Sequence, residues 1–343
     1  MTLDATTPQN GGRRPRLEDV AAEVGVSPAS VSLVLRGAPG PSASTREKVL
    51  EAATRLGYRP DRAASLLARR RSGMLGVVMD VRSTFHAELV EELLAAAETR
   101  GYDLVLGART PARDEDRAVE TLVDSRCEAL VLLGTEAPAS RLAELDRQVP
   151  VVAVGRRVDR AGVDVVRIPD DEGTGLSVAH LTGLGHTGIA YLDGGAGAIA
   201  TDRRHGYRSA MQQAGLGDRI RVLPGDHTEE AGARAGHALL AEGPLPTAVV
   251  AFNDRNALGL LDTLSRAGVD VPGQVSIVGY DDSPMARLAH VDLTSVSQDV
   301  TGLVEHTLTA IVERLDGGRT DHREVLLPPR LVVRGTSGPP RTS

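Results

Sequence analysis

The sequence is poor in aromatic residues and in cysteine. It contains no Trp, two Phe and five Tyr in 343 residues, so Leu, Val and Ala must fill its hydrophobic cores. The single cysteine, Cys127, excludes an internal disulfide framework and fits a reducing compartment. We therefore expect a globular protein of the cell interior that is stabilised by packing rather than by covalent cross-links.

Long hydrophobic runs are also missing. No stretch of about 18 apolar residues is present, so we expect no membrane span and no membrane partner. The N-terminal residues are polar and lack the apolar core of a secretory signal, which predicts a cytoplasmic location. A chain of 343 residues is too long for one ordinary core and predicts two or three packed units.

The overall charge of −7 conceals an asymmetry along the chain. Residues 1–72 contain twelve Lys and Arg against seven Asp and Glu, a net charge of +5. The remainder contains 27 against 39, a net charge of −12. A basic segment on an acidic body indicates that a polyanion binds at one end of the chain. The alternative is a solvated, Arg-rich tail, which the regular pattern inside this segment disfavours.

Three short segments near the N-terminus have apolar residues at helical spacing. Gly25 is expected to end the first helix, and Ser27 to cap the second with Pro28 at its first position. Ser42 or Ser44 starts the third helix. Two short helices joined by a glycine-containing turn and supported by a third predict a helix-turn-helix domain over residues 16–60. The three apolar stripes are Leu17, Val20, Ala21 and Val24; Val31, Val34 and Leu35; and Val49, Ala52, Ala53 and Leu56.

The second helix is expected to enter the major groove of DNA with its N-terminal residues over the base edges. Its exposed positions are Pro28, Ala29, Ser32 and Leu33. Ser32 can bond a phosphate oxygen, whereas the other three offer apolar contact, for example to thymine methyl groups. A small helical bundle that does not bind DNA would show the same stripes, and the positive charge of the segment favours DNA.

The motifs of this segment are specific. Leu17-Glu-Asp-Val-Ala, Val24-Gly-Val-Ser, Ser30-Val-Ser-Leu-Val-Leu, Thr45-Arg-Glu-Lys-Val and Leu56-Gly-Tyr-Arg-Pro resemble the DNA-binding head of the lactose-repressor (LacI/GalR) family. The resemblance covers nearly all of residues 16–72. Leu33 stands where the family often has a polar base reader, Arg36 where Asn is common, and Arg16 where a Thr usually caps the first helix. The resulting DNA-contact set is Ser27, Pro28, Ala29, Ser32, Leu33, Arg36, Arg46, Tyr58, Ala64 and Leu67.

Residues 61–72 are predicted to form a hinge helix that follows the head, and residues 1–15 a disordered arm. The hinge has good helix formers but is too short to be stable alone in water, so DNA could order it. The resemblance implies that Ala64 and Leu67 face the minor groove and that Leu67 wedges between base pairs. The alternative is that Leu66 and Leu67 pack on a hydrophobic core.

From residue 73 onwards, short apolar runs alternate with helical patterns. The expected strands in two series are 75–80, 102–107, 129–134 and 151–154, then 189–192, 220–223, 248–252 and 275–280. Strands that alternate with helices predict parallel sheets, and two series predict two lobes. Ligands of such sheets bind beyond the carboxyl ends of the strands, although Asp and Asn there also serve as turn formers. The polar residues at these ends are Asp80, Arg156, Asp193, Asn253, Asp254, Asp281 and Asp282.

Further motifs place the body in the same family. Among them are Arg203-Arg-His-Gly-Tyr, Phe252-Asn-Asp and Ser276-Ile-Val-Gly-Tyr-Asp-Asp, which resemble the LacI-family core and, through it, periplasmic sugar-binding proteins. The resemblance implies a first lobe of about 73–168 and 299–326 and a second of about 169–298 and 327–336. Arg203 and Asp281 would form an Arg/Asp pair in the cleft. Such a pair can bind neighbouring sugar hydroxyls through charge-assisted hydrogen bonds. His227 stands where many members have a stacking aromatic. The implied effector contacts are Asp80, Phe85, His86, Arg156, Arg203, His227, Asn253 and Asp281.

Other motifs are weaker. Residues 195–200 approximate a dinucleotide fingerprint but lack an acidic ribose partner, so we interpret them as a loop. His180 and His186 lack a third ligand at metal spacing. We therefore expect no catalytic residues, no metal and no cofactor. The predicted function is a homodimeric transcriptional regulator, a repressor of a near-palindromic DNA operator, controlled by a small-molecule effector such as a sugar. The alternatives are a sugar-transport protein and an α/β enzyme.

Overall fold

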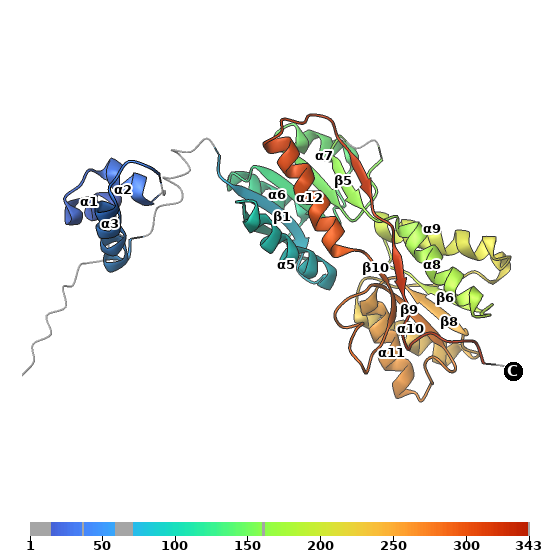
Figure 1. Cartoon of the computed structure of the whole chain (residues 1–343). Helices are drawn as coiled ribbons and strands as arrows, with labels where there is room; N and C mark the ends of the chain where they lie inside the picture. The colour runs from blue at the N-terminus through green and yellow to red at the C-terminus, as the bar shows by residue number, and fades with distance from the viewer. Residues whose placement is uncertain (1–14, 36–37, 59–70, 160–161, 342–343) are drawn as a thin grey trace, which may run out of the picture. The chain divides into compact units, whose positions relative to one another are not determined.

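The computed structural model describes residues 15–35, 38–58, 71–159 and 162–341 (Figure 1). The chain divides into two compact units, Met1–Ser72 and Gly73–Ser343, which are treated separately below. Several predicted features lie outside the described residues: nearly all of the N-terminal arm, most of the hinge, and Arg36, Ala64 and Leu67.

The first unit contains three helices, α1 (Leu17–Val24), α2 (Pro28–Leu35) and α3 (Ala43–Leu56). They enclose one small core, in which Val20, Val31 and Val49 are fully buried. The three apolar stripes predicted from the sequence meet in this core, with Leu17, Val24, Leu35 and Leu56 packed at its edge. The predicted all-α helix-turn-helix head is therefore confirmed.

Local capping explains where these helices begin and end. Gly25 adopts a left-handed conformation with φ 74° and donates its N–H to the carbonyl of Ala21, as expected of a helix stop. Ser27 accepts a hydrogen bond from the N–H of Ser30 at 3.2 Å. Of the two serines proposed to start α3, Ser42 is the cap, since it accepts from the N–H of Thr45.

The second unit contains two six-stranded sheets. The first sheet has the order β11-β5-β4-β3-β1-β2, and all its neighbouring strands are parallel. Its strands are β1 (Met74–Asp80), β2 (Asp103–Arg109), β3 (Ala129–Leu133), β4 (Val151–Val154), β5 (Asp164–Arg167) and β11 (Glu324–Leu326).

The second sheet has the order β12-β10-β9-β8-β6-β7. Only the pair β10 and β12 is antiparallel among its described strands. Its strands are β6 (Ile189–Leu192), β7 (Arg221–Leu223), β8 (Ala248–Ala251), β9 (Ser276–Asp281), β10 (Thr294–Ser297) and β12 (Arg330–Val332). The two-lobed α/β core with parallel sheets is thus confirmed.

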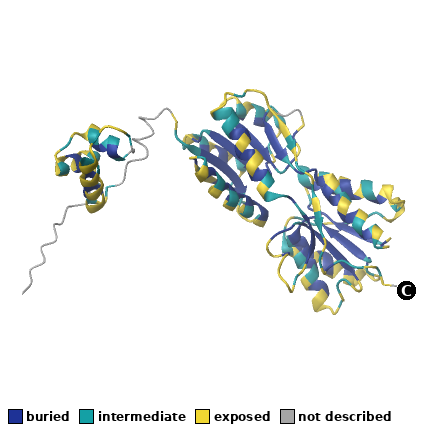
Figure 2. Ribbon diagram, viewed as in Figure 1, coloured by how far each residue is buried: buried dark blue, intermediate teal, exposed yellow. Residues whose placement is uncertain are grey.

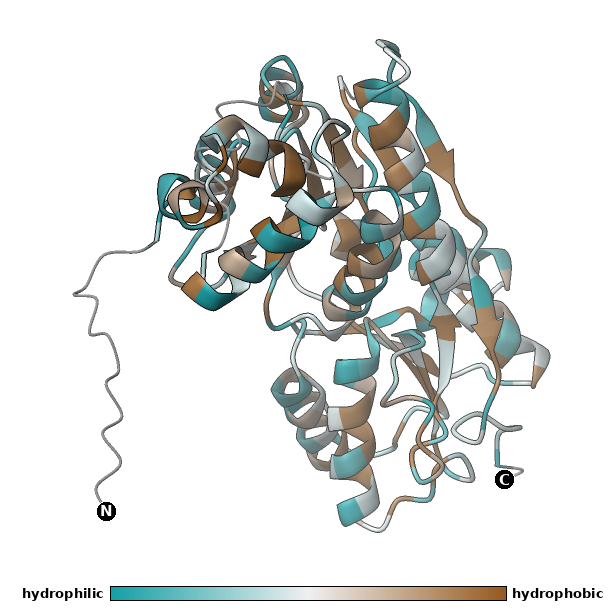
Figure 3. Ribbon diagram, turned by 60° about the vertical axis from the view of Figure 1, so that its left-hand side comes forward, coloured by the Kyte–Doolittle hydropathy of each residue, from teal (hydrophilic) through white to brown (hydrophobic). Residues whose placement is uncertain are grey.

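Helices cover both faces of each sheet, which is why the central strands are buried throughout (Figure 2). In the first lobe, α5 (Thr84–Thr99) and α12 (Val300–Leu315) cover one face, and α6 (Glu115–Asp124) and α7 (Ala139–Asp146) the other. In the second lobe, the pairs are α8 (Asp170–Gly183) with α9 (Ala198–Gln213), and α10 (Glu229–Glu242) with α11 (Asp254–Arg266). Hydrophobic and hydrophilic stretches alternate along these helices (Figure 3). No described helix is long and apolar enough to span a membrane.

The chain passes between the lobes three times. It leaves the first sheet after β5 to form α8, returns after β10 to form α12, and leaves again after β11 to end in β12. Residue Gln298 lies on the second of these crossings. Three neighbouring segments of the chain therefore link the lobes. They join one edge of the first sheet, formed by β11 and β5, to one edge of the second sheet, formed by β12 and β10.

One local prediction was wrong. The segment 195–200 was interpreted as a loop, but α9 begins at Ala198, so the interpretation holds only for residues 195–197. Gly197 precedes the helix with φ 110°, a conformation that glycine adopts without strain. Apolar Ala198, Ile199 and Ala200 form its first turn, and Ala200 is buried against the lobe.

Candidate ligand cleft and DNA-binding head

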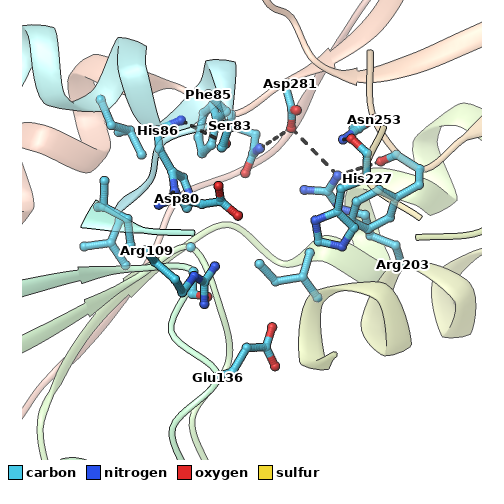
Figure 4. Close-up of a pocket in the computed structure, with 18 residues that line it drawn as sticks. Asp80, Ser83, Phe85, His86, Arg109, Glu136, Arg203, His227, Asn253 and Asp281 are labelled. Atoms are coloured by element: carbon cyan, nitrogen blue, oxygen red, sulfur yellow. Dashed lines mark hydrogen bonds and ion pairs between the residues drawn. The ribbon is translucent and has the colours of Figure 1, made fainter. Parts of the chain in front are cut away.

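A cavity of about 660 Å³, including the part that opens to solvent, lies between the two lobes. Its walls come from the carboxyl ends of strands of both sheets, among them β1, β2, β8 and β9 (Figure 4). This is where open α/β sheets bind ligands. The lining residues are Asp80, Ser83, Phe85, His86, Leu89, Arg109, Leu133, Gly134, Glu136, Val154, Gly155, Ile199, Arg203, His227, Phe252, Asn253, Asp281 and Gln298.

Seven of the eight residues predicted to contact an effector line this cavity: Asp80, Phe85, His86, Arg203, His227, Asn253 and Asp281. The exception is Arg156. Its neighbour Gly155 lines the cavity, but the buried Arg156 turns its guanidinium to the carbonyl oxygen of Ala137, with Nη2 at 2.7 Å. The structure therefore does not bring Arg156 into the site, and the contacts of the other seven with a ligand stay a prediction.

Arg203 is buried at the centre of the second lobe's wall. Its Nε donates to Oδ1 of Asp170 at 2.7 Å, and its Nη1 donates to the carbonyl oxygen of Phe252 at 2.6 Å. The guanidinium also lies over the ring of Tyr280, 3.5 Å from the ring centre. Burial raises the pKa of Asp170, and Arg203 opposes this effect. These contacts hold the planar cation in one orientation.

Asp281 lies next to this cation at the end of β9. Its Oδ1 is 3.7 Å from Nη1 of Arg203 and accepts a hydrogen bond from Nε2 of Gln298 at 2.6 Å. The backbone of Asp281 has φ 112°, which is strained for a residue with a side chain. Burial raises the pKa of Asp281, while Arg203 lowers it. The carboxyl group is thus presented to the cavity beside a fixed guanidinium, an arrangement that can bind two neighbouring hydroxyl groups.

The first turn of α5 supplies the first lobe's wall. The N–H of Asp80 donates to Nδ1 of His86 at 3.1 Å, so this ring nitrogen carries no proton. Burial, with a smaller contribution from nearby Arg109, lowers the pKa of His86 to about 4. His86 is therefore neutral at physiological pH and presents its other ring nitrogen as a donor. Ser83 begins the helix by accepting from the N–H of His86.

The aromatic part of the second lobe's wall is formed by His227 and Phe252. Their ring centres are 4.6 Å apart with planes tilted by 30°. Asn253 caps α11 by accepting from the N–H of Asn256 at 2.9 Å and donates to the carbonyl of His227 at 3.3 Å. Burial lowers the pKa of His227, and Arg203 adds to this effect. His227 therefore offers a neutral ring face to the cavity.

One hydrogen bond and one unpartnered carboxyl oxygen lie where the lobes meet beside the cavity. Arg255 at the start of α11 donates from Nη1 to the carbonyl oxygen of Arg82 at 2.8 Å. Glu88 on α5 has a buried Oε1 without a hydrogen-bond partner among the described residues. Burial raises the pKa of Glu88 to about 7; Arg287 opposes the shift, whereas Asp254 and Asp282 of the second lobe add to it.

The head presents a short exposed ridge at the start of α2. Ser27, Pro28 and Ala29 are exposed, and Ser32 and Leu33 are half-buried on the same helix. Two other predicted DNA contacts have structural roles. Arg46 donates from Nη2 to the carbonyl oxygen of Ala38 at 2.9 Å, and Tyr58 packs against the small core.

Comparison with known proteins identifies the chain. Residues 16–61 match the family model described as bacterial regulatory proteins, lacI family, and residues 178–337 match the periplasmic binding protein-like domain. The transcriptional regulator MalR of Streptomyces coelicolor is 34% identical over 337 residues, covering 94% of this chain and 96% of that protein. The chain belongs to the LacI family of bacterial regulatory proteins.

Solved structures agree with this assignment. A LacI regulator from a Rhodococcus species is 44% identical with a TM-score of 0.74, covering 78% of this chain and all of that chain. The lac repressor dimer bound to operator and an anti-inducer is 28% identical with a TM-score of 0.82 over 95% of this chain and all of that one. A CelR–cellobiose complex is 30% identical with a TM-score of 0.69 over 94% and all of the respective chains.

These relatives are named as transcriptional regulators, so the predicted DNA-binding regulator, rather than an enzyme, is confirmed. Several cavity residues of this LacI-family chain escaped the sequence analysis. Arg109 follows directly from β2, and a strand-end rule applied to that strand would have found it. Glu136 follows β3 by three residues, so the same rule would have found it, whereas Gln298 lies on a chain crossing and no local sequence signal marks it. The cavity residues that were missed are Ser83, Leu89, Arg109, Leu133, Gly134, Glu136, Val154, Gly155, Ile199, Phe252 and Gln298.

Proposed function

We propose that this LacI-family regulator is a homodimeric repressor whose DNA affinity is controlled by a carbohydrate effector in the cleft between its lobes. The observation that supports the effector most directly is the pairing of Arg203 with Asp281 in the cavity wall. A buried guanidinium beside a carboxyl group forms charge-assisted hydrogen bonds to adjacent hydroxyls. The CelR structure contains cellobiose, a carbohydrate, in a protein of similar fold.

The DNA-contact set is also proposed. Ser27, Pro28 and Ala29 form the exposed N-terminal end of α2, which suits docking in the major groove. The segment 1–72 has a net charge of +5, which favours phosphate contacts and a location with the genomic DNA in the cytoplasm. Ala64 and Leu67, the proposed minor-groove residues, lie outside the described part of the chain.

A dimer is supported by two features. The neighbouring lac repressor structure is a dimer on its operator, and two heads related by symmetry would read the halves of a near-palindrome. Large apolar side chains are also exposed in the second unit, including Leu94 on α5 and both Met285 and Leu288 after β9. A second copy of the chain would cover such residues.

The effector acts in this scheme by preferring one arrangement of the lobes. Only the difference in its affinity for two arrangements can change DNA binding. Arg255 and Glu88 lie where the lobes meet and would sense such a rearrangement. The sequence and the geometry leave the sign open, so a screen must determine whether effector releases or promotes DNA binding.

The test combines a ligand screen with DNA binding. Purified full-length chain is screened by thermal shift against mono- and disaccharides, and hits are confirmed by calorimetry. DNA binding is then measured by fluorescence anisotropy on DNA from upstream of the protein's own gene and on random duplex, with and without the hit. Stabilisation by a carbohydrate that also changes operator affinity supports the proposal. Absence of any carbohydrate that changes DNA binding contradicts it.

A further inference from the structure

Glu136 is a cavity residue for which the proposed function has no role. It follows β3 and projects into the cavity on the side opposite Asp281 (Figure 4). A Cβ atom placed on Gly197 would lie 2.9 Å from Oε1 of Glu136, so the carboxylate sits against the first residues of α9 in the other lobe.

The carboxylate of Glu136 has no cationic partner. No Lys, Arg or His among the described residues lies within 4 Å of its oxygens. The side chain is exposed to the cavity rather than packed in the lobe. Asp80, on the same lobe, accepts the N–H of Arg82 and is 3.9 Å from the mostly exposed guanidinium of that residue. A bound ligand would therefore meet two carboxylates on this wall.

Each guanidinium that lines the cavity is already paired with a carboxylate of the protein. Arg203 is bonded to Asp170 and to the Phe252 carbonyl. Arg109 is 3.4 Å from Glu115 and shares its guanidinium with the carbonyl oxygen of Gly134. Each lining guanidinium thus has a carboxylate partner that offsets part of its attraction for an anionic ligand.

The two histidines of the cavity do not change this balance. Nδ1 of His86 accepts a hydrogen bond from a backbone N–H, which requires the unprotonated nitrogen. The pKa of His227 is lowered by burial and by Arg203. Asp281 lies 3.7 Å from Arg203 and its pKa is raised by burial, so the negative charge that lines the cavity without an ion-pair partner among the described residues is that of Glu136, with Asp80 on the same wall.

We propose that Glu136, supported by Asp80, sets the charge specificity of the cavity, so that neutral or amino-substituted carbohydrates bind and phosphorylated or carboxylated ones are rejected. This inference rests on the proposed carbohydrate effector and specifies its chemical class. A phosphate or carboxylate brought into the cavity would lose its hydration shell and face an unpaired carboxylate. At separations of about 8 to 10 Å and an effective dielectric constant of about 20, one such charge changes affinity by at least about tenfold.

The experiment compares ligands that share one carbon skeleton and differ in charge. Calorimetry on the full-length chain measures glucose, glucosamine, glucose 6-phosphate and glucuronate, the matching galactose series, and the charged derivatives of the best neutral carbohydrate from the screen. We expect the anionic forms to bind at least tenfold more weakly than the neutral form. Glu136→Gln is expected to reduce the difference in affinity between the neutral and anionic forms about tenfold. The affinity for the neutral form should stay within about threefold of its wild-type value.

Two controls separate charge selection from a structural effect. Glu98→Gln removes an exposed carboxylate of α5 that does not line the cavity, and it should leave the difference unchanged. If Glu136 only shaped the cavity, its replacement would weaken neutral and anionic forms equally, which would contradict the inference. Raising the salt concentration should also reduce the difference in affinity between neutral and anionic forms for the wild-type chain, because salt screens the repulsion.

The remaining outcomes are distinct. An anionic form that binds the wild-type chain as tightly as its neutral counterpart overturns charge selection and leaves the carbohydrate effector intact. Failure of every form in every series to bind overturns the carbohydrate effector and this inference with it. Selective binding of the neutral and amino forms, relaxed by Glu136→Gln alone, supports both.

Discussion

Arg203 and Asp170 form a buried ion pair in the wall of the ligand cavity. The two side chains are 5% and 3% exposed, and Nε of Arg203 lies 2.7 Å from Oδ1 of Asp170. The adjacent residue on α9, Arg204, pairs with Asp193, but these side chains are 28% and 12% exposed. One helix thus carries a buried and a partly solvated ion pair side by side, which allows a matched comparison.

Arg203→Ala should destabilise the protein much more than Arg204→Ala. Removing Arg203 leaves Asp170 buried without its charge partner, a change that costs about 3–5 kcal/mol. Removing Arg204 should cost less than this, although Asp193 is itself buried, because the side chain of Arg204 is 28% exposed and its ion pair is already partly solvated. Urea denaturation of the two variants measures the difference. Equal destabilisation would show that the burial of the Arg203 pair has no energetic consequence.

Asp281→Asn should reduce effector affinity without unfolding the protein. Asn tolerates the positive φ at this position better than most residues, and neutralising a buried carboxyl whose pKa is raised removes a desolvation cost. The loss of a charge-assisted hydrogen bond should weaken ligand binding by about ten- to a hundredfold. Calorimetry with the best carbohydrate gives the affinity, and a thermal melt shows whether stability is kept. Unchanged affinity would remove Asp281 from the ligand contacts.

Glu88 should make stability fall as the pH rises from about 4.5 to 7. Its pKa is raised to about 7 in the folded chain, so the folded state keeps a proton that the unfolded state releases in this interval. The stabilisation is complete below the unfolded pKa and is lost as pH rises through the folded value. In Glu88→Gln the free energy of unfolding should decrease over this pH interval by about 1 kcal/mol less than in the wild-type chain. This value allows for the partial solvation of Glu88.

Urea denaturation at several pH values tests this dependence. Glu98→Gln, at an exposed position of the same helix and not among the charges that shift the pKa of Glu88, serves as the control. The comparison of variants is needed because Asp254 and Asp281 also have raised pKa values and contribute to the pH dependence of the wild-type chain. Identical curves for Glu88→Gln and wild type would exclude a role of Glu88.

Ala29→Glu should abolish operator binding and leave the head folded. Ala29 is exposed in the first turn of α2, where a carboxylate would face DNA phosphates or base edges. We expect affinity to fall at least a hundredfold in fluorescence anisotropy at moderate salt. Thr54→Glu adds the same charge on an exposed position of α3 and should have a much smaller effect. Similar losses in both variants would indicate a general charge effect rather than docking of α2.

Met285→Asp with Leu288→Asp should separate the proposed dimer. Both side chains are apolar and exposed in the single chain, at 47% and 38%. Charges at these positions would have to be desolvated in an interface. Analytical ultracentrifugation at micromolar concentration should show a monomer, whereas Leu240→Asp, an exposed Leu on α10, should stay dimeric. A dimer that survives the double substitution would place the interface elsewhere.

The sequence determined the local structure of this protein. Helical stripes, the Gly25 stop and the serine caps defined the head, because these signals act between residues a few positions apart. Alternating strands and helices defined the two sheets, and family motifs identified seven residues that line one cavity.

Only the tertiary structure decided which distant residues meet. The side chain of Arg156 turns away from the cavity to the Ala137 carbonyl, although its position at a strand end matched the motif. Gln298 enters the cavity because it lies where the chain crosses back to the first lobe, and Glu136 enters it because the loop after β3 faces the start of α9 in the other lobe. The same packing buries Arg203 and Asp170 together and leaves Glu136 without a cationic partner among the described residues. Burial and charge pairing depend on the whole fold, so residue order alone does not give them.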